Sequence, residues 1–220
     1  MKQHIVFDLD GTLVESLPGI AEGVARALQR MGRPAPSPQQ VRGMIGQGAR
    51  HLCAQALGYA SVEDAPADLL GEMYQRFCCE YPLCWQGSGT VPYAGVQPLL
   101  ETLASRGARL AVLSNKPHEV TLPMVQQLFP AVPFEPILGY TGQFPRKPSP
   151  AALLHIAQQW GISPAELTLV GDSIYDACTA QAAGSGLVLV SWGYADTASL
   201  RKLAAPMARS IPDLAALLGA

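Results

Sequence analysis

The sequence feature that most constrains the fold is the segment at residues 5–13, which reads IVFDLDGTL. Its apolar run stops at two carboxylates, Asp8 and Asp10, and a glycine follows, which predicts a buried strand that runs into a tight turn. Side chains alternate along a strand, so both carboxylates are expected on one side, at the carboxyl end where open α/β sheets bind ligands. A divalent cation would remove their repulsion, and Mg²⁺ prefers one or two carboxylates, waters and a substrate phosphate. The pair therefore suggests phosphate chemistry, although Asp and Gly also form ordinary turns.

Two later segments place groups that suit phosphoryl oxygens near expected strand ends. A strand at 110–113 ends in Ser114 and Asn115, whose hydroxyl and amide are suitable donors, although this pair is also common in turns. Lys147 lies in a proline-stiffened loop just ahead of a predicted helix, which is consistent with a fixed cation aimed at charge. A solvated surface lysine is the alternative for Lys147.

A third segment adds two more carboxylates. The predicted strand 167–170 stops at Gly171 and Asp172, and Asp176 follows four residues later at the start of a helix. Residues four apart share one helical face, so Asp172 is placed to ligate a metal and Asp176 to orient a ligand or its water. The alternative is an acidic first turn that complements the helix dipole.

The organisation of the chain predicts a helical insertion. Apolar spacing between residues 15 and 85 indicates only helices, which is too long for a crossover between neighbouring parallel strands. Helices are expected at 20–31, 38–45, 49–57, 66–81 (ended by Pro82), 96–105 and 151–160, and a further helical region is expected after Asn115, through 125–129. The remaining expected strands are at 137–138 and 186–190, and two helices are expected to close the chain. We therefore expect a core at 1–14 and 91–220 and a helical subdomain at 15–90. The segment 87–92 is expected to be a hinge, and the subdomain either a lid or a fixed appendage.

Composition limits the partners. Charged residues make up 15% of the 220 residues and the net charge is −2, so no basic surface is expected to bind nucleic acid. The first strand leaves no room for a signal peptide and no apolar run is long enough to span a bilayer, so we expect a cytoplasmic protein without membrane contact. Five cysteines fit reduced thiols, and Cys78, Cys79 and Cys84 are expected to be buried small apolar residues. A small phosphorylated metabolite is the expected partner.

The four motifs, taken together, resemble those of the haloacid dehalogenase-like phosphohydrolases. They are the DLDGT of residues 8–12, Ser114-Asn115, Lys147-Pro148 and GDSxxD at 171–176, in that family's order and spacing. The segments 45–50 and 191–194 are similar to the bacterial phosphoglycolate phosphatase branch. The resemblance implies an α/β fold with a Rossmann-like parallel sheet, a three-layer α/β/α core with the first strand central, and an inserted all-helical cap. The chain departs from the usual pattern at Glu15 and Ser149.

The resemblance also implies roles for individual residues. Asp8 is expected to attack phosphorus and form an aspartyl-phosphate, and Asp10 to protonate the leaving oxygen and later activate water. Mg²⁺ would be held by the Asp8 carboxylate, the Asp10 backbone carbonyl and Asp172. The residues expected to bind phosphate are Thr12, Ser114, Asn115 and Lys147. Ser173 and Asp176 are expected to orient the ligands of the metal or its bound water without contacting the metal.

Substrate choice is expected to depend on the helical subdomain. Arg50 follows a glycine-containing loop, 46–49, that would let backbone approach a ligand closely. A guanidinium matches a carboxylate bidentately, so we hypothesise that Arg50 binds a carboxylate at the non-reacting end of the substrate, as in phosphoglycolate. The alternative is a solvated helix arginine that pairs with a neighbouring acid.

Several related activities share parts of this pattern. Asp10 argues against a hydrolytic dehalogenase, and the absence of lysine between 15 and 92 argues against a phosphonoacetaldehyde hydrolase, which needs one for a Schiff base. A pyrophosphatase, a sugar-phosphate phosphatase and a β-phosphoglucomutase of the same family stay open. A non-catalytic phosphate-binding relative or a phospho-accepting receiver is the remote alternative, and a monomer or a homodimer is expected.

Overall fold

The chain divides into two compact units. The computed structural model describes residues 3–220, apart from the side chain of residue 88, so residues 1 and 2 of the expected core lie outside the described residues. One unit combines Met1–Val14 with Pro92–Ala220, and the other is Glu15–Val91. We refer to them as the sheet unit and the helical unit.

A six-stranded sheet organises the sheet unit, with the strand order β5-β4-β1-β6-β7-β8. The described strand pairs of this sheet are parallel, and β1 lies between β4 and β6, so the predicted central position of the first strand is confirmed. The strands are β1 (His4–Phe7), β4 (Arg109–Pro117), β5 (Phe134–Tyr140), β6 (Leu167–Gly171), β7 (Gly186–Val190) and β8 (Met207–Ala208).

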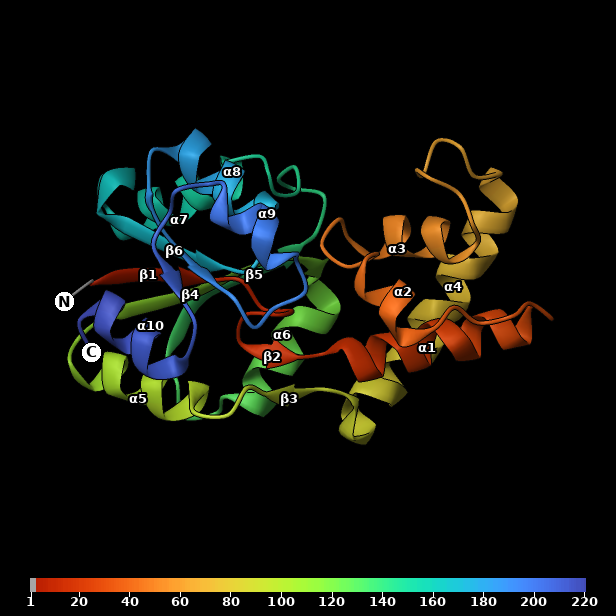
Figure 1. Ribbon diagram of the computed structural model, residues 1–220, viewed down its shortest axis with the longest axis horizontal. Helices are drawn as coiled ribbons and strands as arrows, with labels where there is room; N and C mark the ends of the chain where they lie inside the picture. Colours follow the sequence, from red (N-terminus) through yellow and green to blue (C-terminus); the bar gives the residue numbers. More distant parts are fainter. Residues whose placement is uncertain (1–2) are drawn as a thin grey trace. The chain divides into compact units, whose positions relative to one another are not determined.

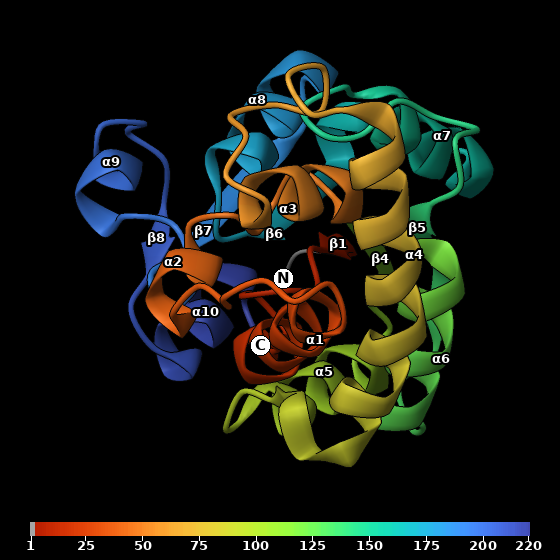
Figure 2. The same ribbon diagram turned by 90° about the vertical axis from the view of Figure 1, so that its right-hand side faces the viewer.

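Helices cover both faces of this sheet. Figures 1 and 2 show α7 and α8 on one face and α5, α6 and α10 on the other, which is the predicted three-layer α/β/α arrangement. The helices of the sheet unit are α5 (Val96–Ser105), α6 (His118–Leu128), α7 (Ala151–Trp160), the 3₁₀ turn η2 (Pro164–Glu166), α8 (Ile174–Ala183), α9 (Thr197–Arg201) and α10 (Ile211–Leu218).

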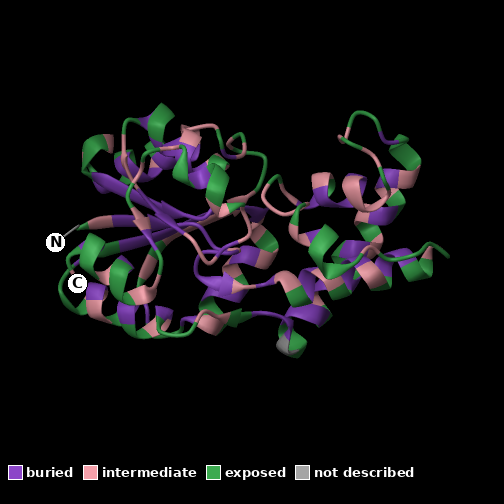
Figure 3. Ribbon diagram, viewed as in Figure 1, coloured by how far each residue is buried: buried purple, intermediate pink, exposed green. Residues whose placement is uncertain are grey.

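The core of the sheet unit is built on its central strands, which are buried along almost their whole length (Figure 3). A sheet covered on both faces needs near-continuous apolar strands, because alternate residues face opposite helical layers. Val6, Leu113 and Leu169 accordingly pack with Leu153 and Ile156 of α7 in one cluster. This rigid core brings the carboxyl ends of β1, β4 and β6 together at one edge.

Three strands of the six-stranded sheet differ from the sequence-based expectation. β4 extends beyond the predicted 110–113 at both ends, and β5 extends beyond 137–138, because the two strands pair with each other over most of their length. β8 was not predicted at all. Its two residues carry no periodic pattern, and they become a strand only through pairing with Leu189 and Val190 of β7.

The helical unit contains the expected series of helices, with different ends. Its elements are α1 (Leu17–Arg30), α2 (Pro38–Arg42), α3 (Ala49–Ala56), α4 (Ala67–Cys84) and the π turn η1 (Trp85–Gly89). Two short strands, β2 (Val14–Glu15) and β3 (Val91–Pro92), pair as a separate two-stranded sheet where the chain passes between the units. The expectation of helices alone from residue 15 was therefore wrong at Glu15, which is in a strand.

Proline did not end α4, which was expected to stop at Pro82. The helix continues through Pro82 to Cys84 and passes into η1. Tyr81, Cys84 and Trp85 are all buried, so packing of these side chains stabilises the last turn against the intrinsic cost of proline. Within the expected hinge, Gly89 packs so closely on α1 that a Cβ there would lie 2.5 Å from Gly19 Cα.

Hydrogen bonds from nearby side chains mark the start of two helices of this unit. Ser37 forms a capping box with Gln40 at the start of α2, which begins at the predicted residue 38. At α1 the unusual Glu15 accepts a hydrogen bond from the Leu17 backbone N–H at 3.0 Å and so satisfies one of the unpaired donors of the first turn. No described helix combines the length and the apolar character that crossing a bilayer requires.

The cysteines of the described residues are free thiols. Cys84 is buried as expected, but Cys78 and Cys79 are exposed, so the expectation that they are buried was wrong. They lie between Phe77 and Glu80, which face the interior of the unit and turn the two thiols outward.

Candidate active site

The turn after β1 places the first two carboxylates. The Leu9 carbonyl accepts hydrogen bonds from the backbone N–H groups of Thr12, Leu13 and Val14, at 3.0 to 3.2 Å, which closes a tight turn. Gly11 has φ +81°, and a Cβ on it would lie 2.5 Å from Asp172 Oδ2. Glycine is therefore required here both for its conformation and for the space it leaves.

Lys147 brings two of the carboxylates together. Its Nζ lies 2.7 Å from Asp8 Oδ1 and 2.6 Å from Asp176 Oδ1, and all three residues are buried. Ser173 donates from its backbone N–H and its hydroxyl to the other oxygen of Asp176, at 3.1 and 2.5 Å, while capping α8. The Asp176 carboxylate therefore has partners from this chain on both oxygens and supports Lys147.

Asp172 completes a buried group of three carboxylates. One oxygen from each of Asp8, Asp172 and Asp176 lies within 4.8 Å of the others. Asp172 Oδ2 accepts a hydrogen bond from the Tyr194 backbone N–H at 2.6 Å. Gly193 lies directly over this side chain, because a Cβ there would be 2.2 Å from Asp172 Oδ2. The loop after β7 thus orients the carboxylate.

The charges in this group are out of balance. Burial raises the pKa of Asp8 to about 7; Lys147 opposes the shift, and Asp176 and Asp10 add to it. Burial, followed by the charges of Asp8 and Asp176, raises the pKa of Asp172 well above its ordinary value. Burial works against the charge of Lys147, but Asp176 and Asp8 outweigh it and raise the lysine pKa. One ammonium therefore faces three carboxylates.

This arrangement fits a divalent cation. Buried carboxylates that repel one another are stabilised by a metal ion, and Mg²⁺ takes oxygen ligands of this kind. Asp8 and Asp172 are the residues of the group suited to hold it. Lys147 and Ser173 engage both oxygens of Asp176, whereas Lys147 contacts Oδ1 of Asp8 and Tyr194 donates to Oδ2 of Asp172.

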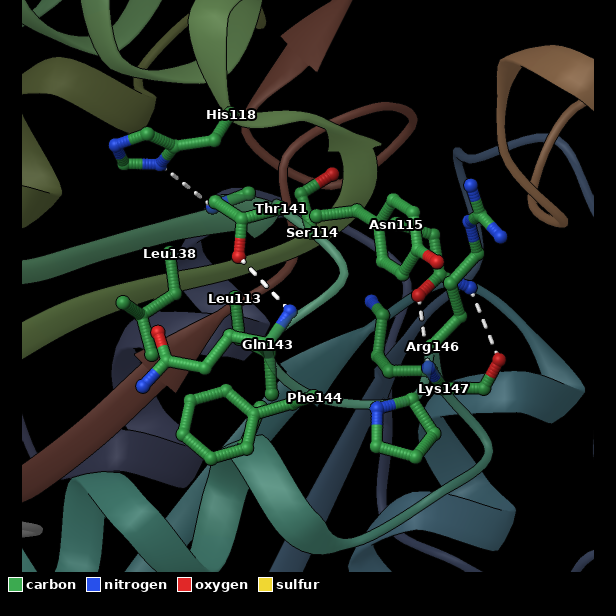
Figure 4. A pocket seen from close by; sticks show the side chains of 14 residues that line it. Leu113, Ser114, Asn115, His118, Leu138, Thr141, Gln143, Phe144, Arg146 and Lys147 are labelled. Carbon is green, nitrogen blue, oxygen red and sulfur yellow. Dashed lines mark hydrogen bonds between the residues drawn. The ribbon is translucent and has the colours of Figure 1, made fainter.

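The amide of Asn115, which was expected to face a ligand, is hydrogen-bonded to the backbone of Lys147. Its Nδ2 donates to the Lys147 carbonyl at 3.0 Å, and its Oδ1 accepts from the Lys147 backbone N–H at 2.8 Å (Figure 4). The side chain therefore fixes the loop that carries the lysine. Ser114 is buried next to it, and its hydroxyl accepts from the Lys116 backbone N–H at 3.2 Å. Contacts of either residue with phosphate stay a prediction.

Ser114 and Asn115 also line a pocket of about 150 Å³ together with Lys147 (Figure 4). Its other walls include Leu138 and Phe144, and the guanidinium of Arg146 lies 3.4 Å from the centre of the Tyr140 ring. The pocket thus adjoins the carboxyl ends of β4 and β5.

Thr12 contains a polar atom that the protein does not satisfy. Its hydroxyl is buried and has no hydrogen-bond partner among the described residues, while its carbonyl accepts from Trp192 Nε1 at 3.3 Å. A buried hydroxyl without a partner is costly, so this position suits a ligand atom. The expected phosphate contact of Thr12 stays a prediction.

The structure adds one residue that sequence reasoning did not single out. Lys116 Nζ lies 2.9 Å from both oxygens of Asp10, and its side chain is only 6% exposed. The available signal was its place directly after Ser114-Asn115 in a chain with only four lysines.

Arg50 belongs to the helical unit. It is exposed near the start of α3, with its guanidinium 5.2 Å from the centre of the Tyr74 ring. This cation–π contact is neither the expected substrate contact nor the alternative pairing with an acid. Its role in substrate choice stays a prediction.

Comparison with known proteins gives consistent matches. A family model described as haloacid dehalogenase-like hydrolase matches residues 5–190. The phosphoglycolate phosphatase of Pseudomonas putida is 36% identical over 194 residues, which are 86% of this chain and 70% of that protein. The phosphoglycolate phosphatase of Rhodospirillum rubrum is 35% identical over 212 residues, which are 93% of this chain and 86% of that protein.

Solved structures agree on the fold. A Haemophilus somnus protein described as a "predicted phosphoglycolate phosphatase" has a TM-score of 0.83 at 28% identity, over 98% of this chain and 97% of that one. A crystal structure from Lactobacillus delbrueckii has a TM-score of 0.89 at 24% identity, over 100% of this chain and 99% of that one, a likeness that concerns the fold.

Proposed function

The chain belongs to the haloacid dehalogenase-like hydrolase family, and we propose that it is a Mg²⁺-dependent phosphatase that hydrolyses phosphoglycolate through an aspartyl-phosphate. The observation that carries the proposal is the buried group of Asp8, Asp172 and Asp176 around Lys147 at the carboxyl edge of the sheet. Such a group has the charge and the location for a metal and a phosphate.

Two half-reactions account for hydrolysis. An Asp8 carboxylate oxygen attacks phosphorus, the bond between phosphorus and the glycolate oxygen breaks, and Asp10 gives its proton to that oxygen. Water then attacks the phosphorus of the aspartyl-phosphate and gives a proton to Asp10. Phosphate leaves, and both carboxyl groups return to their starting states.

The surrounding residues would stabilise the charge that moves during both steps. Mg²⁺, held by the Asp8 carboxylate, the Asp10 carbonyl and Asp172, would supply positive charge to the phosphoryl oxygens. Lys147 stays protonated beside its two carboxylates and would bind phosphate together with Thr12, Ser114 and Asn115. Asp176 and Ser173 hold Lys147 in place.

Phosphoglycolate is the proposed substrate because the two relatives at about one-third identity are named for that activity. The substrate is a small dianionic phosphate attached to a carboxylate. Arg50 of α3 is the proposed partner of the carboxylate, since a guanidinium binds that group with two hydrogen bonds.

A phosphate-release assay tests the proposal. The protein is given phosphoglycolate, pyrophosphate and glucose 6-phosphate in turn, with Mg²⁺ or with a chelator. We expect the highest kcat/KM for phosphoglycolate and no release in the chelator. A higher kcat/KM for either other compound would overturn the substrate, and no release from any of them with Mg²⁺ would overturn the phosphatase activity itself.

A further inference from the structure

A second buried lysine lies beside the reacting carboxylates. Lys116 Nζ contacts both oxygens of Asp10 at 2.9 Å, although the two residues are 106 positions apart in the sequence. The side chains are 6% and 12% exposed. Removing an ammonium and a carboxylate from water is expensive, and the attraction within a buried pair often does not repay that expense, so the protein holds this charge near the reacting group at a cost in stability.

The backbone of Lys116 is fixed on both sides. Its N–H donates to the Ser114 hydroxyl at 3.2 Å, and its carbonyl accepts from the Thr121 hydroxyl at 3.3 Å. Thr121 is completely buried, and β5 approaches it so closely that a Cβ on Gly139 would be 2.6 Å from its Oγ1. β4, β5 and α6 together therefore determine where the lysine side chain starts.

The two lysines of the site contact different carboxylates. Lys147 contacts Asp8 and Asp176, whereas Lys116 contacts Asp10. When Asp10 carries the proton that the proposed mechanism requires, one of its oxygens can still accept from Lys116 while the other holds the proton. A carboxyl group held in this way has a defined orientation, and proton transfer in the transition state depends on such orientation.

We propose that Lys116 is a positioning residue that fixes the orientation of the Asp10 carboxyl group for proton transfer to the leaving oxygen. The inference rests on the proposed function, in which Asp10 transfers that proton. It assigns Lys116 no direct contact with the phosphoryl group and no role once Asp10 is absent.

The test is a double-mutant cycle that combines Lys116→Met with Asp10→Asn. The measured quantity is kcat/KM, which reports the first half-reaction. Losing charge-assisted hydrogen bonds should lower kcat/KM for phosphoglycolate by roughly tenfold to a hundredfold when Asp10 is present. When Asp10 is already replaced, the same substitution should change kcat/KM by less than about twofold.

Two further readouts separate positioning from phosphate binding or general support of the fold. Nitrophenolate leaves without a proton, so Lys116→Met should lower kcat/KM for p-nitrophenyl phosphate by no more than about threefold. The inhibition constant of inorganic phosphate should stay within about twofold of the unmodified protein, because the lysine is not assigned to phosphate. The exposed Lys202 supplies the matched control, and Lys202→Met should leave all of these values unchanged.

The outcomes are separable. An equal loss with and without Asp10, or weaker inhibition by phosphate, would overturn the role of Lys116 while leaving the proposed function intact. No loss of activity in Asp10→Asn alone would instead overturn the proposed function. If Lys116→Met fails to fold, the same cycle with Lys116→Ala, which also removes the hydrogen-bond donor, decides between these outcomes.

Discussion

The buried carboxylates of the two units differ in how well cationic side chains balance their charge. Among the described residues of the helical unit, Glu80 is the one buried charged side chain, and it contacts Arg30 Nε and lies 4.0 Å from Arg26 Nη1. In the sheet unit, Asp8 and Asp176 both contact Lys147, and Asp172 lies beside them. The acid of the helical unit is matched by arginines, whereas the acids of the sheet unit have too few cationic partners.

The difference separates a structural ion pair from a binding site. The partners of Glu80 are largely exposed arginines on α1 that close over it, so this charge requires nothing from outside the protein. The acids of the sheet unit are left with excess negative charge by the fold, and a cation would relieve it. Substitutions in the two places should therefore have opposite consequences for stability and for activity.

The largest expected effect follows from replacing Asp8. Asp8→Asn should lower kcat by at least about a thousandfold, because an amide cannot attack phosphorus and binds Mg²⁺ poorly. The fold should persist, as judged by circular dichroism and thermal unfolding. Turnover close to that of the unmodified protein would contradict the covalent mechanism.

Glu80→Gln is the matched control from the helical unit. Removing this charge should lower the free energy of unfolding by about 1 to 3 kcal/mol, since charge-assisted hydrogen bonds to the arginines are lost. The kcat measured at a temperature where the protein is folded should change little. If Glu80→Gln abolished turnover in a folded protein, buried charge would not distinguish the two units as described.

Substitutions of Asp10 and Asp172 are expected to affect different properties, the reaction rate and the Mg²⁺ affinity respectively. Asp10→Asn should lower the rate by roughly a hundredfold to ten-thousandfold, the usual contribution of a positioned acid or base, and should still bind Mg²⁺. Asp172→Asn should weaken Mg²⁺ binding itself, which calorimetry on the isolated protein measures without turnover. A loss of Mg²⁺ affinity as large in Asp10→Asn as in Asp172→Asn would contradict this division of roles.

The charge imbalance should also appear as a pH dependence of stability without metal. The pKa of Asp8 is raised from 3.8 to about 7, so the folded state binds a proton more tightly than the unfolded state does. Between these two values the folded protein holds more protons, and stability therefore falls as pH rises, by up to about 4 kcal/mol from this residue. The raised pKa of Asp172 acts in the same direction.

Denaturant unfolding from pH 4 to pH 8 in a chelator measures this fall. Asp8→Asn should remove the part due to Asp8, and saturating Mg²⁺ should reduce the fall in the unmodified protein. A pH profile that is the same for the unmodified protein and for Asp8→Asn would show that Asp8 is not the strained group.

Among the substitutions expected to lower activity, the smallest effect concerns Arg50 in the helical unit. Losing a charge-assisted hydrogen bond to a carboxylate costs about 1.5 to 3 kcal/mol, so Arg50→Ala should lower kcat/KM for phosphoglycolate by roughly tenfold to over a hundredfold. The kcat/KM for p-nitrophenyl phosphate, which has no carboxylate, should fall far less. An equal loss on both substrates would assign Arg50 to support of the helical unit, for which its contact with Tyr74 is a ready explanation.

Much of the fold followed from local patterns. The apolar run before Asp8 predicted the central strand, and α2 and α7 begin at the predicted residues 38 and 151. Such signals succeed because strand alternation, helix periodicity and capping act over a few neighbouring residues. The predictions failed where distant partners decide, as in β8, which exists through pairing with β7, and at Pro82, where buried neighbours extend the helix.

The sequence by itself determined which chemical groups stand at the strand ends and in what order, since Asp8, Asp10, Lys147 and Asp172 each adjoin a recognisable local motif. Only the tertiary structure decided how these groups are paired. It assigned Lys147 to Asp8 and Asp176, the amide of Asn115 to the backbone of Lys147, and Lys116 to Asp10 across 106 residues. The physical reason is that spacing along the chain describes only contacts between residues that are close in sequence. The pairing of buried charges depends instead on which strands the core brings together, and on the space that Gly11 and Gly193 leave beside Asp172.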